Sequence, residues 1–234
     1  MFDLWCKDMI DFKKISQKLP DINYTYVTSF LKDNNKPFDG MSIAEKVTKK
    51  ENSEYFGIPP EEIVEYWGLS NDFGNKQHRK IEYYFKENKK CEYSDFLESE
   101  NLTHENCYAE VPVVSHKYRL TGKIDIVEHI KKDGNNFYKV WDTKTSKKFT
   151  ADKILEASKQ ILLYCVMLNE HLPAGDKAVP GKIIHIGNTS KPTDYDVNLW
   201  KPSRPRTYIF DKECVDLLNQ ILLKRNKNLL ENVK

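Results

Sequence analysis

The chain has 234 residues, with 37 Lys and Arg against 35 Asp and Glu. This near balance excludes a global basic field, so nucleic-acid binding would have to be local, and no apolar stretch approaches the roughly 20 residues of a membrane span. The five cysteines show no CxxC spacing, which argues against a zinc site or a disulfide framework. The charged N-terminal residues do not resemble a secretory signal. We expect one intracellular domain, cytoplasmic or nuclear, without membrane contact.

Helical patterns dominate up to about residue 100. Residues 24–32 and 41–50 are short amphipathic segments, and residues 58–68 predict a helix because Pro60 suits a first turn and Gly68 an end. Apolar residues at four-residue spacing from Phe73 to Phe85 predict a second helix over residues 72–88. A further short helix is expected within residues 93–100.

Three β-rich runs follow, at residues 107–116, 119–130 and 136–145. The Asp133-Gly134 turn signal between the last two predicts an antiparallel meander. A long amphipathic helix is then expected over residues 150–172, followed by a strand at 181–187, a proline-bearing loop, an edge strand at 206–210 and a closing helix. This order predicts an α+β or α/β fold with a mixed sheet.

An acid and a lysine, Asp142 and Lys144, stand two residues apart at the end of the third run. On a strand both side chains project to one face. Pairing around the turn would bring Asp125 near them, on the face opposite to that shared by Ile124 and Ile126. Two carboxylates in a half-buried sheet are costly unless a cation binds them, and Mg²⁺ is commonly held by one or two carboxylates together with substrate phosphate.

These three residues predict phosphodiester hydrolysis, because a lysine beside the metal can orient an attacking water or offset charge on the phosphate. The competing interpretation is structural. An acid-lysine pair on a strand is most often a weak, solvated ion pair.

Three motifs add a resemblance to a known family: Gly122-x-x-Asp125, Asp142-x-Lys144 and Gln160-x-x-x-Tyr164. With His78 on the upstream helix, this succession resembles the PD-(D/E)XK nuclease superfamily, in its RecB-like exonuclease branch. The element order is similar to that superfamily's restriction-endonuclease-like αβββαβ core. A looser similarity links the N-terminal part to uncharacterised nucleases of large DNA viruses and phages.

The resemblance implies a single nuclease domain over residues 1–234. Residues 1–70 would be a helical N-terminal extension, residues 71–190 the core, and residues 191–234 a loop and a C-terminal helix. The extension could form an arch or wall that restricts access to a strand end.

The resemblance also implies roles for individual residues. The metal ligands would be His78, Asp125, Asp142 and the carbonyl of Thr143, with Lys144 as the catalytic lysine beside Asp125 and Asp142. Glu82 and Glu110 would serve a second metal or its waters, and Gln160 and Tyr164 would contact nucleic acid or buttress the site. For His78, Gln160 and Tyr164 the alternative is an ordinary surface or packed residue.

The implied cofactor is one or two Mg²⁺ or Mn²⁺ ions. No iron-sulfur cluster is expected, because the members that carry one have a Cys trio after the core and this chain has Cys214 alone there.

Basic and aromatic residues near the motifs are candidate nucleic-acid contacts. Lys147 and Lys148 follow the site directly, and Lys201, Arg204 and Arg206 lie in the later loop, where they could reach phosphates. The candidate stacking partners for unpaired bases are Trp200, Tyr208 and Tyr118, and Thr28 and Ser29 could bind a terminal phosphate. A merely solvated loop is the competing interpretation.

The sequence thus predicts a Mg²⁺- or Mn²⁺-dependent exodeoxyribonuclease that hydrolyses single-stranded or frayed DNA ends, as in DNA repair or recombination. A structure-specific endonuclease and an RNA-cleaving nuclease of the same superfamily are alternatives. A catalytically inactive nucleic-acid-binding module is another. The sequence predicts no particular protein partner.

Overall fold

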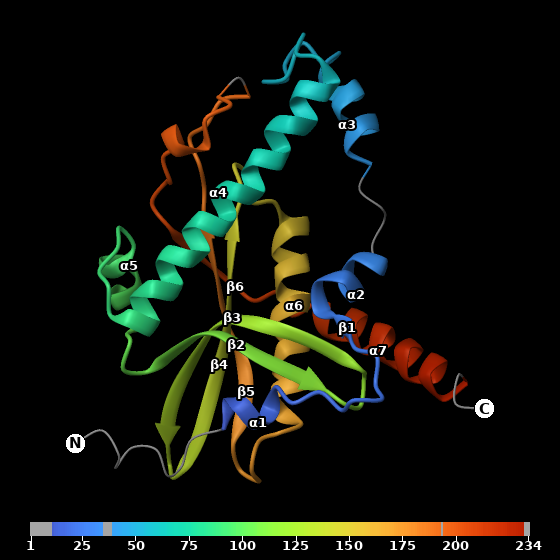
Figure 1. Cartoon of the computed structure of the whole chain (residues 1–234), viewed down its shortest axis with the longest axis vertical. Coiled ribbons are helices and arrows are strands. Elements are labelled where there is room, and N and C mark those ends of the chain that lie inside the picture. Colours follow the sequence, from blue (N-terminus) through green and yellow to red (C-terminus); the bar gives the residue numbers. More distant parts are fainter. Residues whose placement is uncertain (1–10, 35–38, 193, 232–234) are drawn as a thin grey trace.

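The computed structural model describes residues 11–34, 39–192 and 194–231 (Figure 1). Its centre is a six-stranded mixed sheet in the order β1-β3-β4-β5-β6, with β2 on the other edge of β3. The strands are β1 (Thr25–Tyr26), β2 (Cys107–Ser115), β3 (Leu120–Lys132), β4 (Asn135–Thr145), β5 (Lys177–Ile186) and β6 (Arg206–Ile209). The predicted meander is confirmed, since β2, β3 and β4 pair antiparallel, and β5 returns parallel to β4.

Helices cover both faces of this sheet (Figure 1). They are α1 (Phe12–Ile15), α2 (Val27–Asp33), α3 (Gly40–Val47), α4 (Pro60–Glu87), α5 (Ser94–Ser99), α6 (Ala151–Asn169) and α7 (Cys214–Glu231), with a 3₁₀ turn at Val197–Leu199. The α6 cluster, as we call the apolar core that α6 shares with α2 and α7, covers one face. The α4 cluster, formed by the C-terminal half of α4 with α5, covers the other. Among the described residues, no helix is long and apolar enough to cross a bilayer.

One long helix replaces the two that the sequence predicts between residues 58 and 88. The expected end at Gly68 is wrong, because α4 runs on to Glu87 and ends where Asn88 adopts a left-handed conformation. Tyr66 and Phe73, two turns apart, both pack against Trp200. This packing outweighs the roughly 1 kcal/mol that a glycine costs inside a helix.

The N-terminal amphipathic segment also differs from expectation. Residues 24–32 contain the short strand β1 before α2, and β1 pairs parallel with the start of β3, Thr25 opposite Leu120. By contrast, the Asp133-Gly134 turn is as predicted. Both residues have positive φ, 51° and 79°, as the favoured two-residue hairpin turn requires.

In β2 and β3, the residues that point to a given face of the sheet change from one alternate set to the other near Glu110. Ala109 packs in the α4 cluster but Val111 in the α6 cluster, and Ile126 and Ile124 divide in the same way. The prediction that Ile124 and Ile126 share a face is therefore wrong. In β2 the change falls at Glu110, whose left-handed φ of 55° breaks the alternation of that strand, and β3 changes face at the level paired with it.

The same level of the sheet is irregular on both sides of β4. Pairing with β3 ends at Ile126 opposite Trp141, and the register with β5 shifts between Val140 and Asp142. A bulge of this kind re-aims side chains and is common beside active sites. Asp142 thus lies just beyond the last residue of β4 that pairs with β3, and at the point where the pairing of β4 with β5 shifts its register.

Candidate active site

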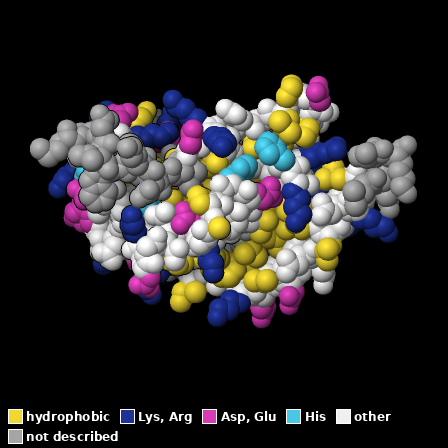
Figure 2. Space-filling view, turned by 90° about the horizontal axis from the view of Figure 1, so that it is seen from below, with side chains coloured by type: hydrophobic (Ala, Val, Ile, Leu, Met, Phe, Trp, Pro, Cys, Tyr) yellow, Lys and Arg dark blue, Asp and Glu magenta, His cyan; other side chains and the backbone are white. Residues whose placement is uncertain are grey.

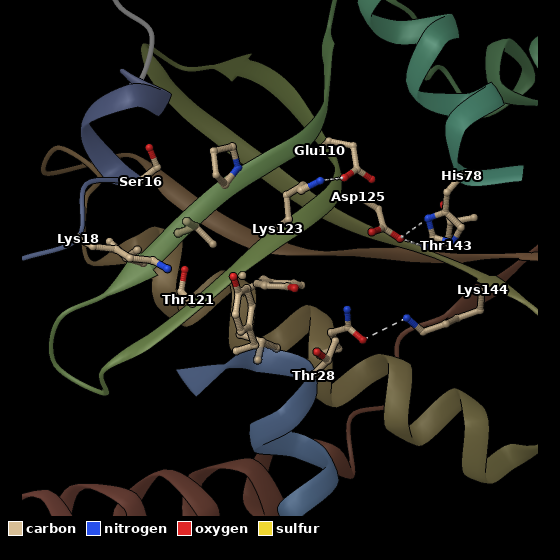
Figure 3. A pocket seen from close by; sticks show the side chains of 18 of the residues that line it. Ser16, Lys18, Thr28, His78, Glu110, Thr121, Lys123, Asp125, Thr143 and Lys144 are labelled. Carbon is tan, nitrogen blue, oxygen red and sulfur yellow. Dashed lines mark hydrogen bonds and ion pairs between the residues drawn. The ribbon is translucent and has the colours of Figure 1, made fainter. Parts of the chain in front are cut away.

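A cleft opens where β4 separates from β3. β4 pairs with β3 only from Ile126 onward, and β1 pairs with the same edge only at Leu120 and Thr121. The cavity in this gap has a volume of about 620 Å³ (Figure 3). Five of the six motif residues line it, namely Gly122, Asp125, Lys144, Gln160 and Tyr164, together with Thr143 and with His78 from α4. The sixth, Asp142, is buried behind this wall.

Three potential metal ligands meet at one end of this cleft. His78, Glu110 and Asp125 each offer one ligand atom, and these atoms all lie within 4.8 Å of one another. His78 Nδ1 is 3.6 Å from Asp125 Oδ2. The three residues come from α4, β2 and β3, so the site forms only when the helix packs on the sheet. Two carboxylates and an imidazole are a donor set that fits a divalent cation.

Asp142 and Lys144 form a buried pair next to these ligands. Lys144 Nζ donates to Asp142 Oδ1 at 2.8 Å and to Gln160 Oε1 at 3.1 Å. Asp142 Oδ2 lies 2.7 Å from the same nitrogen but accepts no well-directed hydrogen bond from any described residue. Asp142 is only 2% exposed. A buried carboxylate oxygen with unused acceptor capacity is what a cation site needs.

The electrostatics of the pair follow from this burial. Burial raises the pKa of Asp142 to about 6, with Lys144 lowering it and the charge of Asp125 raising it. Burial alone would lower the pKa of Lys144, but the carboxylates of Asp142 and Asp125 outweigh that effect and hold it above its ordinary value. Lys144 therefore stays an ammonium at neutral pH.

Asp125 is fixed by the backbone of β4. The Thr143 N–H donates to Asp125 Oδ2 at 2.8 Å, so the carboxylate takes the place of a strand partner where the ladder has ended. The side chain of Thr143 is buried, and its Oγ1 finds no hydrogen-bond partner among the described residues. The assignment of the Thr143 carbonyl to a metal stays a prediction.

Tyr164 closes the open edge of β3. A Cβ on Gly122 would lie 2.7 Å from Tyr164 Cε1, so only glycine permits this contact. Burial raises the pKa of Tyr164 above its ordinary value, and the charges of Asp125 and Asp142 raise it further, against hydrogen bonds from the Lys123 backbone and the Gln160 side chain. The hydroxyl stays protonated. These contacts favour a buttressing role for Tyr164, and Gln160 steadies Lys144.

The other predicted acids and bases lie outside the three-ligand group. Glu82 pairs with Lys86 at 2.7 Å and lines a small adjoining cavity. Lys147 pairs with Glu54, while Lys148, Arg204 and Arg206 are exposed and do not line the cleft. Their contact with nucleic acid stays a prediction. In Figure 2, basic side chains are interspersed with acidic ones, in line with the balanced charge.

Two of the predicted stacking partners are wrong. Trp200 and Tyr118 are buried and offer no free ring face, and Tyr208 packs against Phe149. The cleft is also lined by Ser16, Lys18 and Tyr26, which lie in the segment before α2 and were not predicted as site residues. Nothing in their local pattern signals this position, because it depends on the pairing of β1 with β3. Glu110, by contrast, was predicted from the resemblance, and it lies between the pairs Ala109–Ile126 and Val111–Ile124, within reach of Asp125.

Two acids and a lysine at a strand separation, with an imidazole and a further acid beside them, are the side chains that metal-dependent phosphodiester hydrolysis requires. A family model described as the PD-(D/E)XK nuclease superfamily matches residues 45–231, and the chain belongs to that superfamily. This finding confirms the resemblance at superfamily level and, with it, a nucleic-acid substrate and the use of divalent metal ions. A search of curated proteins gave no match.

Proposed function

We propose that the chain is a Mg²⁺- or Mn²⁺-dependent exodeoxyribonuclease of the RecB-like branch, acting on single-stranded or frayed DNA ends. The observation that carries the proposal is the buried Asp142–Lys144 pair beside the His78, Glu110 and Asp125 group, in which Asp142 Oδ2 accepts no well-directed hydrogen bond from the described residues. Removing two strand acids from water in this way is costly without a cation.

His78, Glu110, Asp125 and Asp142 are the side chains that would hold the metal. A bound Mg²⁺ or Mn²⁺ supplies Lewis-acid polarisation of the phosphate and lowers the pKa of a coordinated water. Asp125 is held in place by the Thr143 N–H. Lys144, fixed between Asp142 and Gln160, orients the attacking water and offsets negative charge that develops on the phosphate.

The shape of the cleft supports action on strand ends. Figure 3 shows Ser16 and Lys18 at one end of the cavity and His78 at the other. A strand that reached the metal ligands with its end against residues 16–18 would be positioned for removal of terminal nucleotides. In this proposal residues 1–234 act as one nuclease domain, and the N-terminal extension belongs to its substrate site.

The test is a degradation time course with Mg²⁺ or Mn²⁺ on four labelled substrates: linear single-stranded DNA, the same DNA circularised, blunt duplex DNA and RNA. We expect the linear single strand to be degraded fastest, the circle to survive, and the Lys144→Ala protein to be inactive. Equal cleavage of circle and linear strand would indicate an endonuclease. Faster cleavage of RNA would indicate an RNA-cleaving enzyme, and no cleavage at all would indicate an inactive binding module.

A further inference from the structure

The cleft includes a wall that lies outside the family match. The match begins at residue 45, yet Ser16, Lys18, Tyr26 and Thr28 line the same cavity as the candidate active site. This N-terminal wall, as we call residues 16–28, lies before the matched region in the sequence.

The N-terminal wall is held firmly against the sheet. Tyr24 Oη is 2.6 Å from His116 Nδ1 and accepts the Leu19 N–H at 3.2 Å. Arg225 of α7 donates to Thr25 Oγ1 at 3.0 Å and to the Tyr118 carbonyl at 3.2 Å. Side chains on this segment are thus presented to the cleft from an anchored backbone.

Lys18 is an uncompensated cation at the cleft. Lys144 pairs with Asp142 and Lys123 pairs with Glu110, whereas Lys18 forms no ion pair with any residue that the structure describes. Lys18 is exposed, and its Nζ points into the cavity (Figure 3). An exposed ammonium without a carboxylate partner is a site for an anion, here a phosphate of the substrate strand.

Tyr26 places an aromatic ring beside that cation. The side chain is 61% exposed at the cleft, and Lys18 Nζ lies 5.4 Å from its ring centroid. Exposed aromatic rings next to basic groups are the stacking platforms of single-strand binding sites, because every base has a π face. The 620 Å³ cavity is within the size range of sites that hold a drug-sized ligand, which suits a nucleotide.

We propose that Lys18 and Tyr26 bind one unpaired nucleotide of the substrate strand, Lys18 through its phosphate and Tyr26 through its base. The N-terminal wall would then select single-stranded ends, because a base inside a duplex has both faces covered by its neighbours and cannot stack on Tyr26. This inference rests on the proposed function, because it says how the substrate of that nuclease is held next to the active site.

The experiment measures oligonucleotide binding rather than cleavage. Fluorescence anisotropy of a labelled single-stranded DNA is recorded with the Lys144→Ala protein, taken as the parent, over a range of salt concentrations. Added to this parent, Tyr26→Ala should weaken binding on the order of tenfold without changing the salt dependence, and Tyr26→Phe should restore it. Lys18→Ala should reduce the slope of log affinity against log salt by about 0.7, and Lys18→Arg should restore it.

A second exposed tyrosine-lysine pair, whose lysine is ion-paired with Glu87, supplies a control away from the cleft. Tyr83 is 46% exposed with Lys89 Nζ 5.5 Å from its ring centroid, but the pair lies on and just after α4 and lines none of the cavities around the site. Tyr83→Ala and Lys89→Ala should leave both affinity and salt slope unchanged. Melting curves confirm that each variant is folded.

The outcomes separate this inference from the proposed function. If the parent binds DNA and the Lys18 and Tyr26 variants bind equally well, the inference is overturned while the nuclease assignment stands. If the wild type fails to cleave DNA, the nuclease assignment is lost, but the binding series still decides the inference. A parent that binds no single-stranded DNA would overturn it too.

Discussion

Glu128 and Asp142 are buried carboxylates on the same two strands, and they differ in how their oxygens are satisfied. Glu128 lies where β3 and β4 are fully paired, opposite Lys139. It accepts the Trp141 indole N–H at 3.0 Å and lies 3.5 Å from Lys139 Nζ. Asp142 lies where the strands separate and keeps one oxygen without a well-directed donor among the described residues.

The difference shows how one strand pair serves two purposes. In the paired part, Glu128 Oε2 has both an indole donor and an ammonium nearby, and such contacts of fixed geometry contribute to stability. In the separated part, Asp142 is buried beside the cleft and one of its oxygens accepts no well-directed hydrogen bond from any residue that the structure describes, at a cost to stability. The proposed function depends on the carboxylate oxygen that the described part of the fold leaves without a hydrogen bond. The variants below change one residue in the separated part or one in the paired part.

The largest expected effect is on catalysis. Asp142→Asn should lower the rate of DNA hydrolysis by at least about 100-fold, because it removes a proposed metal ligand and the partner of Lys144. Glu128→Gln, its matched control, should keep the rate within about twofold and cost about 1 kcal/mol of stability. The measurements are initial rates on end-labelled DNA and denaturant unfolding. Equal rates of hydrolysis for the two variants would show that Asp142 has no more part in catalysis than Glu128.

The next largest effect is expected at Gly122, which lies in the part of β3 that does not pair with β4. Gly122→Ala should destabilise the fold by about 1–3 kcal/mol and lower activity, because the new methyl group would stand 2.7 Å from the ring of Tyr164. Urea unfolding and the rate assay test both expectations. A variant with wild-type stability and rate would show that the Tyr164 contact has no structural role.

The pH dependence of stability tests the burial of Asp142. Its pKa is raised from the ordinary 3.8 to about 6, so the folded state holds this proton more tightly than the unfolded state does. Between those pH values, the contribution of Asp142 to stability must fall as the pH rises. In chelator, the free energy of unfolding of wild type relative to Asp142→Asn should therefore fall from pH 4 to pH 6. A difference that is flat or grows would contradict this assignment.

The smallest effect concerns the glycine of the paired part. Gly134 has a φ of 79° and open space around it, so Gly134→Ala meets backbone strain alone. We expect a loss of about 1 kcal/mol with unchanged hydrolysis, measured by the same two assays. A loss of activity would mean that the hairpin turn is coupled to the site.

Local chemistry made much of this molecule predictable. The Asp133-Gly134 turn determines the hairpin register, and that register brings Asp125 and Asp142 together. Gly68 was misinterpreted because packing of Tyr66 and Phe73 on a distant loop decides the course of α4. The predicted face of Ile126 is wrong because the period-two rule assumes an unbroken pleat, whereas β3 changes face between Ile124 and Ile126, next to the left-handed Glu110 of β2. Lys18 and Tyr26 reach the cleft through long-range contacts that no local pattern contains.

The most direct test of the central claim is the anomalous-scattering map of a crystal soaked in Mn²⁺. The account predicts a peak in the cleft, within about 2.5 Å of carboxylate oxygens of Asp125 and Asp142 and beside His78 and Glu110, which disappears in the Asp142→Asn protein. A peak that is unchanged in that variant, or that lies away from Asp125, would contradict it.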